Sequence, residues 1–164
     1  MKISNIQLGK NVIVDPSTSI NNVTIGDRVK IAKYCSIFGS EDTILEIGSD
    51  SIIAMFTLIN GFAAKVSIGN NVSIAQGVNI MCDSGPNASP LMQEYYPLRR
   101  GTVRIGNHCW IGANAIIMPG VELGAFCVVA ANSFVNTSFP PYSLVGGTPA
   151  RLIKNIKNGT AQAL

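Results

Sequence analysis

The chain has 164 residues, of which 47% are apolar, and a net charge of +3 at neutral pH. This length and apolar content suit a single domain, residues 1–164, with one core. No stretch approaches the roughly 18 consecutive apolar residues of a membrane span, and the first ten residues lack the basic-then-apolar order of a signal peptide. We therefore expect a soluble, cytoplasmic protein that does not span a membrane.

The charge pattern also limits the partners. Aromatic residues are not interleaved with basic ones, as a nucleic-acid-binding surface requires, so we expect no nucleic-acid partner. Charged residues make up only 13% of the chain. Because so few charges would leave much of the surface uncharged, we expect self-association into a homo-oligomer.

A period of six residues begins at Ile25 and continues to Val135. Fifteen aliphatic residues occupy the first position of the repeat: Ile25, Ile31, Ile37, Ile47, Ile53, Ile59, Ile68, Ile74, Ile80, Ile105, Ile111, Ile117, Leu123, Val129 and Val135. The next residue is usually Gly or Ala, and the fourth residue after the aliphatic one is usually small or β-branched. Neither a helix, with a period of about 3.6, nor an alternating strand produces this spacing.

Such a period predicts a parallel β-helix. Each hexad would supply a short strand and a corner, three hexads would complete a triangular turn, and the stacked aliphatic residues would form a continuous core. Asp27, Asn70 and Asn107, each two positions after an aliphatic residue, suit tight corners. The Gly or Ala before them suits a place where the chain crowds the neighbouring turn.

The period breaks three times along the chain. Its register lapses at Leu45 and Lys65, which predicts small excursions near Glu41 and Phe62. The third break, residues 82–102, is aperiodic and rich in Pro, Ser, Asn and charge. Loops longer than about 12 to 15 residues are uncommon in compact domains and are usually functional or disordered. We expect this segment to leave the stack as an extruded loop and to return.

After the last hexad, the sequence GGTPAR spans residues 146–151. The two glycines permit a close approach of the backbone to a ligand, and Pro149 turns the chain out of the stack. We expect a short helical tail over residues 149–164.

Four segments carry a resemblance to a known family: IGDRVKIAKYCSI, IGNNVSIAQGVNI, IGNHCWIGANAIIMPGVELGAFCVVAANSFV and PPYSLVGGTPARLIK. They resemble the hexapeptide-repeat acetyltransferases, near the galactoside and maltose O-acetyltransferase branch. The resemblance implies an all-β fold, a left-handed parallel β-helix, which is an exception to the usual right-handed crossover. It also implies a homotrimer that uses acetyl-CoA as co-substrate and binds no metal.

The resemblance places acetyl-CoA in a groove between adjacent subunits. Its expected contacts, from the thioester end to the nucleotide phosphates, are Trp110, Ala113, Ala131, Asn136, Arg151 and Lys154. From the residues alone, a lone Ala is equally explained as a small residue at a crowded corner. A pair of cations is more commonly a solvated face.

This chain departs from the family at the catalytic position. The family's loop carries a His, whereas the only His here is His108, outside the loop. Three alternatives remain open. His108 is the general base, or a loop carboxylate, Asp83 or Glu94, serves instead. In the third alternative, a neutral amine acceptor needs only to be positioned beside the thioester. The simpler explanations are an ordinary corner residue for His108 and solvated carboxylates for the other two.

Other loop residues are candidates for binding the acceptor: Ser84, Asn87, Tyr95 and Arg99. An aromatic ring can stack on a sugar and an arginine can bind a phosphate. The four cysteines are not expected to be catalytic, because three of them occupy the small inward position of a hexad. Cys82, which begins the loop, is a nucleophile only if an acyl-enzyme forms. No cysteine spacing indicates a disulfide framework or a zinc site.

We therefore expect an acetyl-CoA-dependent acetyltransferase that modifies a carbohydrate hydroxyl, in surface polysaccharide synthesis. The alternative acceptor is the amine of an amino sugar, free or linked to a nucleotide. A zinc-dependent β-helix of the carbonic anhydrase type would need three His residues, and the chain has one. A non-catalytic binding or structural protein is the alternative from another class, because a fold does not determine a function.

Overall fold

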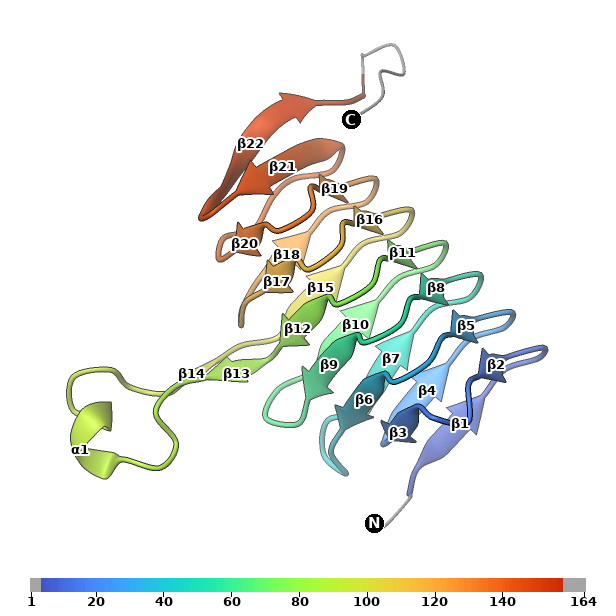
Figure 1. Cartoon of the computed structure of the whole chain (residues 1–164), viewed down its shortest axis with the longest axis horizontal. Coiled ribbons are helices and arrows are strands. Elements are labelled where there is room, and N and C mark those ends of the chain that lie inside the picture. The colour runs from blue at the N-terminus through green and yellow to red at the C-terminus, as the bar shows by residue number, and fades with distance from the viewer. Residues whose placement is uncertain (1–3, 158–164) are drawn as a thin grey trace.

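The computed structural model describes residues 4–157, which form a stack of triangular turns with one long loop projecting from it (Figure 1). Three parallel sheets make the three faces of the stack. The first contains β1 (Ile6–Leu8), β4 (Val23–Ile25), β7 (Leu45–Ile47), β10 (Val66–Ile68), β15 (Val103–Ile105) and β18 (Glu122–Leu123). The second contains β2 (Ile13–Val14), β5 (Lys30–Ile31), β8 (Ile52–Ile53), β11 (Ser73–Ile74), β16 (Trp110–Ile111), β19 (Val128–Val129), β21 (Ser143–Gly147) and β22 (Ala150–Asn155).

The third sheet contains β3 (Ser19–Asn21), β6 (Ser36–Gly39), β9 (Leu58–Gly61), β12 (Asn79–Met81), β17 (Ile116–Ile117) and β20 (Phe134–Val135). Within the repeating turns, from β1 to β12 and from β15 to β21, strands that follow one another in the chain lie in different sheets, and each pairs in parallel with the strand one turn away. The predicted all-β, left-handed parallel β-helix is confirmed. Within the described residues, the only helix has four residues, and none is long enough to cross a membrane.

The core is the column of aliphatic residues that the period of six predicts. All fifteen aliphatic residues at the first hexad position are at most 3% exposed. Parallel pairing stacks them in register, as in the series Ile53, Ile74, Ile111 and Val129 along the second sheet. Because the neighbouring position on a strand faces the other way, Ile52 is 51% exposed whereas Ile53 is fully buried.

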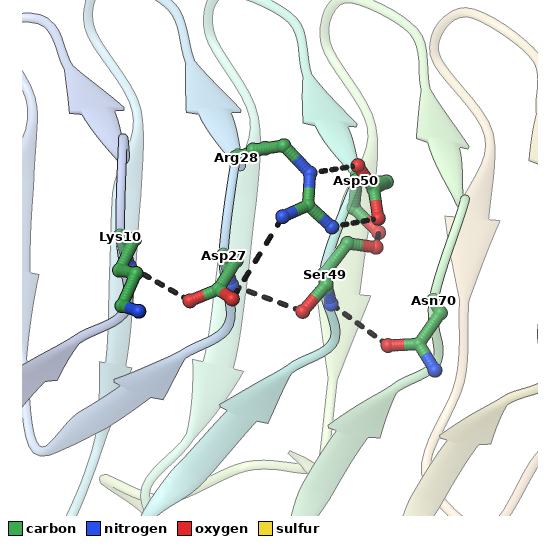
Figure 2. Close-up of polar contacts among 7 residues, drawn as sticks. Lys10, Asp27, Arg28, Ser49, Asp50 and Asn70 are labelled. Carbon is green, nitrogen blue, oxygen red and sulfur yellow. Dashed lines mark hydrogen bonds and ion pairs between the residues drawn. The ribbon is translucent and has the colours of Figure 1, made fainter.

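The corners turn through left-handed residues, which lie three positions after the aliphatic residue. At the first corner, between the first and second sheets, Arg28, Asp50 and His108 have φ angles of 58°, 60° and 58°. The polar residues two positions after the aliphatic one have another role, because they connect adjacent turns. The backbone N–H of Lys10 donates to Asp27 Oδ1 (2.7 Å), and that of Ser49 donates to Asn70 Oδ1 (2.8 Å) (Figure 2).

An ion pair reinforces the same corner. Arg28 donates two hydrogen bonds to the Asp50 carboxylate, at 2.6 and 2.8 Å (Figure 2). The hydrogen bond from Arg28 holds the pKa of Asp50 below its ordinary value. Both side chains are exposed, so the pair contributes modestly to stability and is screened by salt.

The three predicted excursions all leave the stack at the third corner, between the third sheet and the first sheet of the next turn (Figure 1). The first follows β6 and the second follows β9. The third leaves after Met81 and rejoins at Val103. Its two arms pair as an antiparallel ribbon, β13 (Asp83–Ser84) with β14 (Arg99–Arg100), and its tip carries α1 (Pro90–Gln93).

The expected helical tail is wrong for residues 150–155, which form β22, antiparallel to β21. Gly147, with a φ of 102°, lies where the hairpin reverses, and the Thr148–Pro149 peptide bond is cis. The physical reason is the open edge of the last turn: the N–H and C=O groups of β21 have no further turn to pair with, and β22 supplies their partners. Residues 158–164 of the expected tail lie outside the described part.

Candidate active site

Trp110 faces outward from the second sheet and is 46% exposed. Its strand, β16, lies between β11 and β19, where Ser73 and Val128 are the register partners of Trp110. Ile111 points into the core, so the preceding residue must face outward. The structure therefore presents a large apolar ring on the outer face of the C-terminal half of the stack.

Ala113 and Ala131 lie one turn apart at the second corner, between the second and third sheets. The backbone N–H of Asn132 donates to the Ala113 C=O at 2.8 Å. Thr148 lies beside the same corner in the next turn, where its hydroxyl donates to the Asn132 C=O at 3.4 Å. We call the surface formed by Trp110, Ala113, Ala131 and residues 146–149 the donor ledge. Three of the expected contacts with the donor thus lie together.

Of the remaining expected donor residues, Arg151 and Lys154 lie on one strand beside the donor ledge, whereas Asn136 lies elsewhere. Arg151 and Lys154 are on β22, both exposed, and neither makes an ion pair with any residue of the described chain. Arg151 Nη1 donates to the Ala150 C=O at 2.9 Å. Asn136 follows β20 at the third corner, so within one chain the structure does not bring it to the donor ledge.

His108 is an exposed residue of the first corner and stands at the end of an aromatic column. Its ring stacks on Phe126 with 4.7 Å between centroids, and Phe126 stacks on Tyr142 at 4.9 Å. The Lys157 ammonium lies 5.4 Å from the centre of the Tyr142 ring. Because Asp83 and Glu94 belong to the loop at the third corner, the structure does not bring His108 and these carboxylates together within one chain.

The loop forms a cavity of about 560 Å³ that is open to solvent. It is lined by Ser84, Gly85, Pro86, Tyr96, Pro97, Leu98 and Arg99. Two of the four expected acceptor contacts, Ser84 and Arg99, therefore lie together, as register partners on the ribbon. Asn87 and Tyr95 are exposed and outside this lining, and Tyr96 takes the place expected for Tyr95.

Asp83 is half-buried at the base of this loop. Its Oδ1 accepts a hydrogen bond of 2.8 Å from the side-chain amide of Asn60, on the preceding turn. Glu94 instead ends α1 and is exposed. Sequence reasoning missed Asn60, because it lies within the regular stack, far from the loop in the sequence.

The cysteines are structural. All four are free and buried. Cys82 Sγ accepts backbone N–H groups of Ala63 and Ala64, both at 3.3 Å, which ties the second excursion to the loop base. A hydrogen bond with Cys127, together with burial, raises the pKa of the Cys109 thiol. Among residues 4–157, no three His, Cys, Asp or Glu side chains cluster closely enough to bind a metal ion.

Comparison with known sequences supplies the family. A family model described as the hexapeptide repeat of succinyl-transferase matches residues 102–137. YvoF of Bacillus subtilis strain 168, a candidate acetyltransferase, is 31% identical over 132 residues, which are 76% of this chain and 72% of YvoF. The chain belongs to the hexapeptide-repeat acetyltransferases. A candidate lipopolysaccharide biosynthesis O-acetyl transferase, WbbJ of Escherichia coli K12, is 31% identical over 140 residues, or 85% of this chain and 61% of WbbJ.

A solved structure extends the similarity to the whole fold. The S84A mutant of AntD, an N-acyltransferase from Bacillus cereus, superposes with a TM-score of 0.80 at 28% identity, over 92% of this chain and 83% of AntD. That structure is a complex with dTDP-4-amino-4,6-dideoxyglucose and coenzyme A. Together these similarities identify this member of the family as an acyltransferase.

Proposed function

We propose that this protein transfers an acyl group from acyl-CoA, acetyl-CoA in the simplest case, to the amino group of a nucleotide-linked sugar. The observation that carries the proposal is the similarity to AntD over 92% of the chain. The sequence alone favoured a hydroxyl acceptor. The AntD complex supports the amine alternative, because its acceptor is an amino sugar linked to a nucleotide.

The donor would lie along the donor ledge. Trp110 offers an apolar surface beside the thioester, and the alanines leave room for the pantetheine arm. Arg151 and Lys154 carry the unpaired positive charge that suits the nucleotide phosphates. Asn136, at another corner, would contact a donor bound against the neighbouring subunit.

A homotrimer would complete this groove. The outer face of the second sheet exposes Ile13 and Ile52 by 59% and 51%, and the adjoining second corner exposes Met55 by 44%. These three residues also line a shallow apolar groove of about 560 Å³. Packing against a second copy would remove this apolar surface from water. It would also bring one chain's loop to its neighbour's donor ledge.

Asp83 is the proposed general base. The acceptor nitrogen attacks the thioester carbonyl carbon, the C–S bond breaks, and CoA leaves as a thiolate. The nitrogen gives up its proton to the Asp83 carboxylate, which returns it to the departing sulfur. Asp83 is preferred to His108, whose ring is stacked at another corner, and to Glu94, which is exposed, because Asp83 is half-buried, hydrogen-bonded to the stack and next in the chain to Ser84 of the cavity lining.

The acceptor would enter the loop cavity, with its reacting amine at the end nearest Asp83, which precedes the lining residue Ser84 in the chain. Arg99 would bind the diphosphate, and the Tyr96 ring would lie against the sugar or the base. O-acetylation of a surface polysaccharide is the second candidate function, favoured by the similarity to WbbJ. In that reaction Asp83 would take the proton of a hydroxyl.

The test is release of free CoA from acetyl-CoA, followed with a thiol reagent. The acceptors are nucleotide-linked amino sugars, free amino sugars and plain sugars, and the proteins are wild type, Asp83→Asn and His108→Ala. We expect turnover with nucleotide-linked amines, a loss of about 100-fold or more in Asp83→Asn, and little change in His108→Ala. Turnover with hydroxyl acceptors alone would establish the second candidate. Loss in His108→Ala but not in Asp83→Asn would refute the assignment of the base.

A further inference from the structure

Asn60 connects the stack to Asp83 through a side chain whose orientation is fixed at both ends. Its amide nitrogen donates to Asp83 Oδ1 at 2.8 Å, and its amide oxygen accepts the backbone N–H of Phe62 at 3.0 Å. A reversed amide would place its oxygen against the carboxylate and its N–H₂ against the Phe62 N–H. Both contacts would then be repulsive, so the Phe62 bond ensures that a donor faces Asp83.

The excursion after β9 holds the Phe62 N–H in place. Cys82 Sγ accepts the N–H groups of Ala63 and Ala64, so the segment that presents Phe62 is anchored to the base of the loop. The small break in the period near Phe62 therefore supports the Asn60 amide. Its role is to orient a side chain at the candidate site.

The partners of Asp83 leave one carboxylate oxygen available for a proton. Oδ1 accepts from Asn60 and lies 3.9 Å from Cys82 Sγ, whereas Oδ2 has no hydrogen-bond or ion-pair partner in residues 4–157. Arg100 is the register partner of Asp83 on the ribbon, but it is exposed and forms no ion pair with it. A neutral amide orients the carboxylate without adding the opposite charge that would make it a weaker base.

We infer that Asn60 is a positioning residue that holds Oδ1 of Asp83 and so fixes which carboxylate oxygen stays free to take the proton of the acceptor. This inference rests on the proposed role of Asp83 as base. The loop does not need the Asn60 side chain for its attachment to the stack. The backbone N–H of Cys82 donates to the Asn60 C=O (3.0 Å), and that of Gly101 donates to the Cys82 C=O (2.9 Å). These bonds close the loop base whatever side chain stands at position 60.

The experiment compares Asn60→Ala and Asn60→Asp with a matched control, Asn79→Ala. Asn79 lies on the next strand of the same sheet, and its amide donates only to the Gly77 C=O, at 3.2 Å. For each protein we would measure kcat, the KM for donor and acceptor, the pH profile of kcat/KM, and the Tm, with the acceptor that the wild type turns over best.

We expect Asn60→Ala to lower kcat by about 100-fold, because a reacting group displaced by about 1 Å costs that much, while both KM values change little. In Asn60→Asp a second carboxylate faces Asp83, and repulsion between like charges moves the acidic limb of the profile to higher pH. Asn79→Ala should behave as wild type in kcat and in pH profile.

Two results would overturn the inference while leaving the proposed function intact. One is a kcat of Asn60→Ala within about twofold of wild type when Asp83→Asn is inactive. The other is an acidic limb that stays in place in Asn60→Asp. Full activity of Asp83→Asn would instead refute the base itself, and the role of Asn60 with it.

Discussion

Replacing Gly48 by alanine tests the packing between turns at the first corner. A Cβ added there would lie 2.5 Å from Asn70 Oδ1 and 2.6 Å from the Gly69 C=O oxygen, whereas ordinary contacts begin at 3.4 Å. The Asn70 side chain cannot rotate away freely, because its Oδ1 accepts the Ser49 N–H (Figure 2). The Gly69 atoms belong to the backbone. The substitution must therefore break a hydrogen bond and separate two turns.

The cost follows from these two effects. Losing the hydrogen bond lowers the free energy of unfolding by about 1 kcal/mol, and overpacking costs about 1–3 kcal/mol more. A total of about 3 kcal/mol corresponds to a fall in Tm of about 6–12 °C for a chain of this length.

Gly61→Ala is the matched control. A Cβ there would first meet Leu45 Cδ1, at 3.3 Å, and the Gly61 φ is not left-handed. Alanine should be tolerated, with a change within about 1 kcal/mol, because the lower entropy of the unfolded chain offsets a small contact. Thermal unfolding of both variants, followed by circular dichroism at equal protein concentration, measures the difference. Equal Tm values for Gly48→Ala and Gly61→Ala would refute the crowding argument.

Three other predictions concern the corner ion pair, the thiols and the donor ledge. Arg28 lowers the pKa of Asp50, so its stabilising effect is present above the ordinary value of 3.8 and is lost as the pH falls through the lowered value. The Tm of wild type should exceed that of Asp50→Asn at pH 7, and the two should converge near about pH 2; a gap that widens on acidification would contradict this. No thiol of the native protein should react with a thiol reagent and all four should react after unfolding, because all four are buried; one fast native thiol would contradict this. Trp110→Ala should raise the KM for acetyl-CoA, and Arg151→Ala with Lys154→Ala should weaken CoA binding about tenfold in a calorimetric titration; unchanged values would remove these residues from the donor site.

The stack could be predicted because burial in a β-helix repeats with the sequence. In each hexad the aliphatic residue points inward and the preceding residue points outward. The difference in exposure between Ile52 and Ile53 can therefore be predicted from the local sequence of one hexad. The long loop could be predicted for the same reason, since it is the place where the period fails.

The C-terminal strand could not be predicted in the same way. The segment around Leu152 and Ile153 has an apolar and basic pattern that is compatible with a helix or a strand. What decides between them is the unpaired edge of β21, a tertiary feature that the local sequence does not contain. The roles of the polar residues at the corners were only partly predictable. Asp27 and Asn70 are corner residues, but their side chains bridge turns and the left-handed position is the next one.

The candidate site could be located from the sequence through the loop and through the family resemblance, but the contact between Asn60 and Asp83 could not. Asp83 and Ser84 belong to the aperiodic segment, whose length and broken period predict a functional loop. Asn60 lies 23 residues away, and its contact with Asp83 depends on how many residues each excursion adds to a turn. No local signal singled it out, because the equivalent residue on the other strands of the third sheet, such as Phe38, Met81 and Met118, is not Gly or Ala either.

Product analysis tests the central claim most directly. The protein would be incubated with acetyl-CoA and a nucleotide-linked 4-amino sugar, and the product examined by mass spectrometry before and after mild base, which hydrolyses esters but not amides. The account predicts one base-stable acetyl group on the sugar nucleotide, formed in proportion to the CoA released. A base-labile acetyl group, or an unmodified amino sugar with plain sugars acetylated instead, would contradict it.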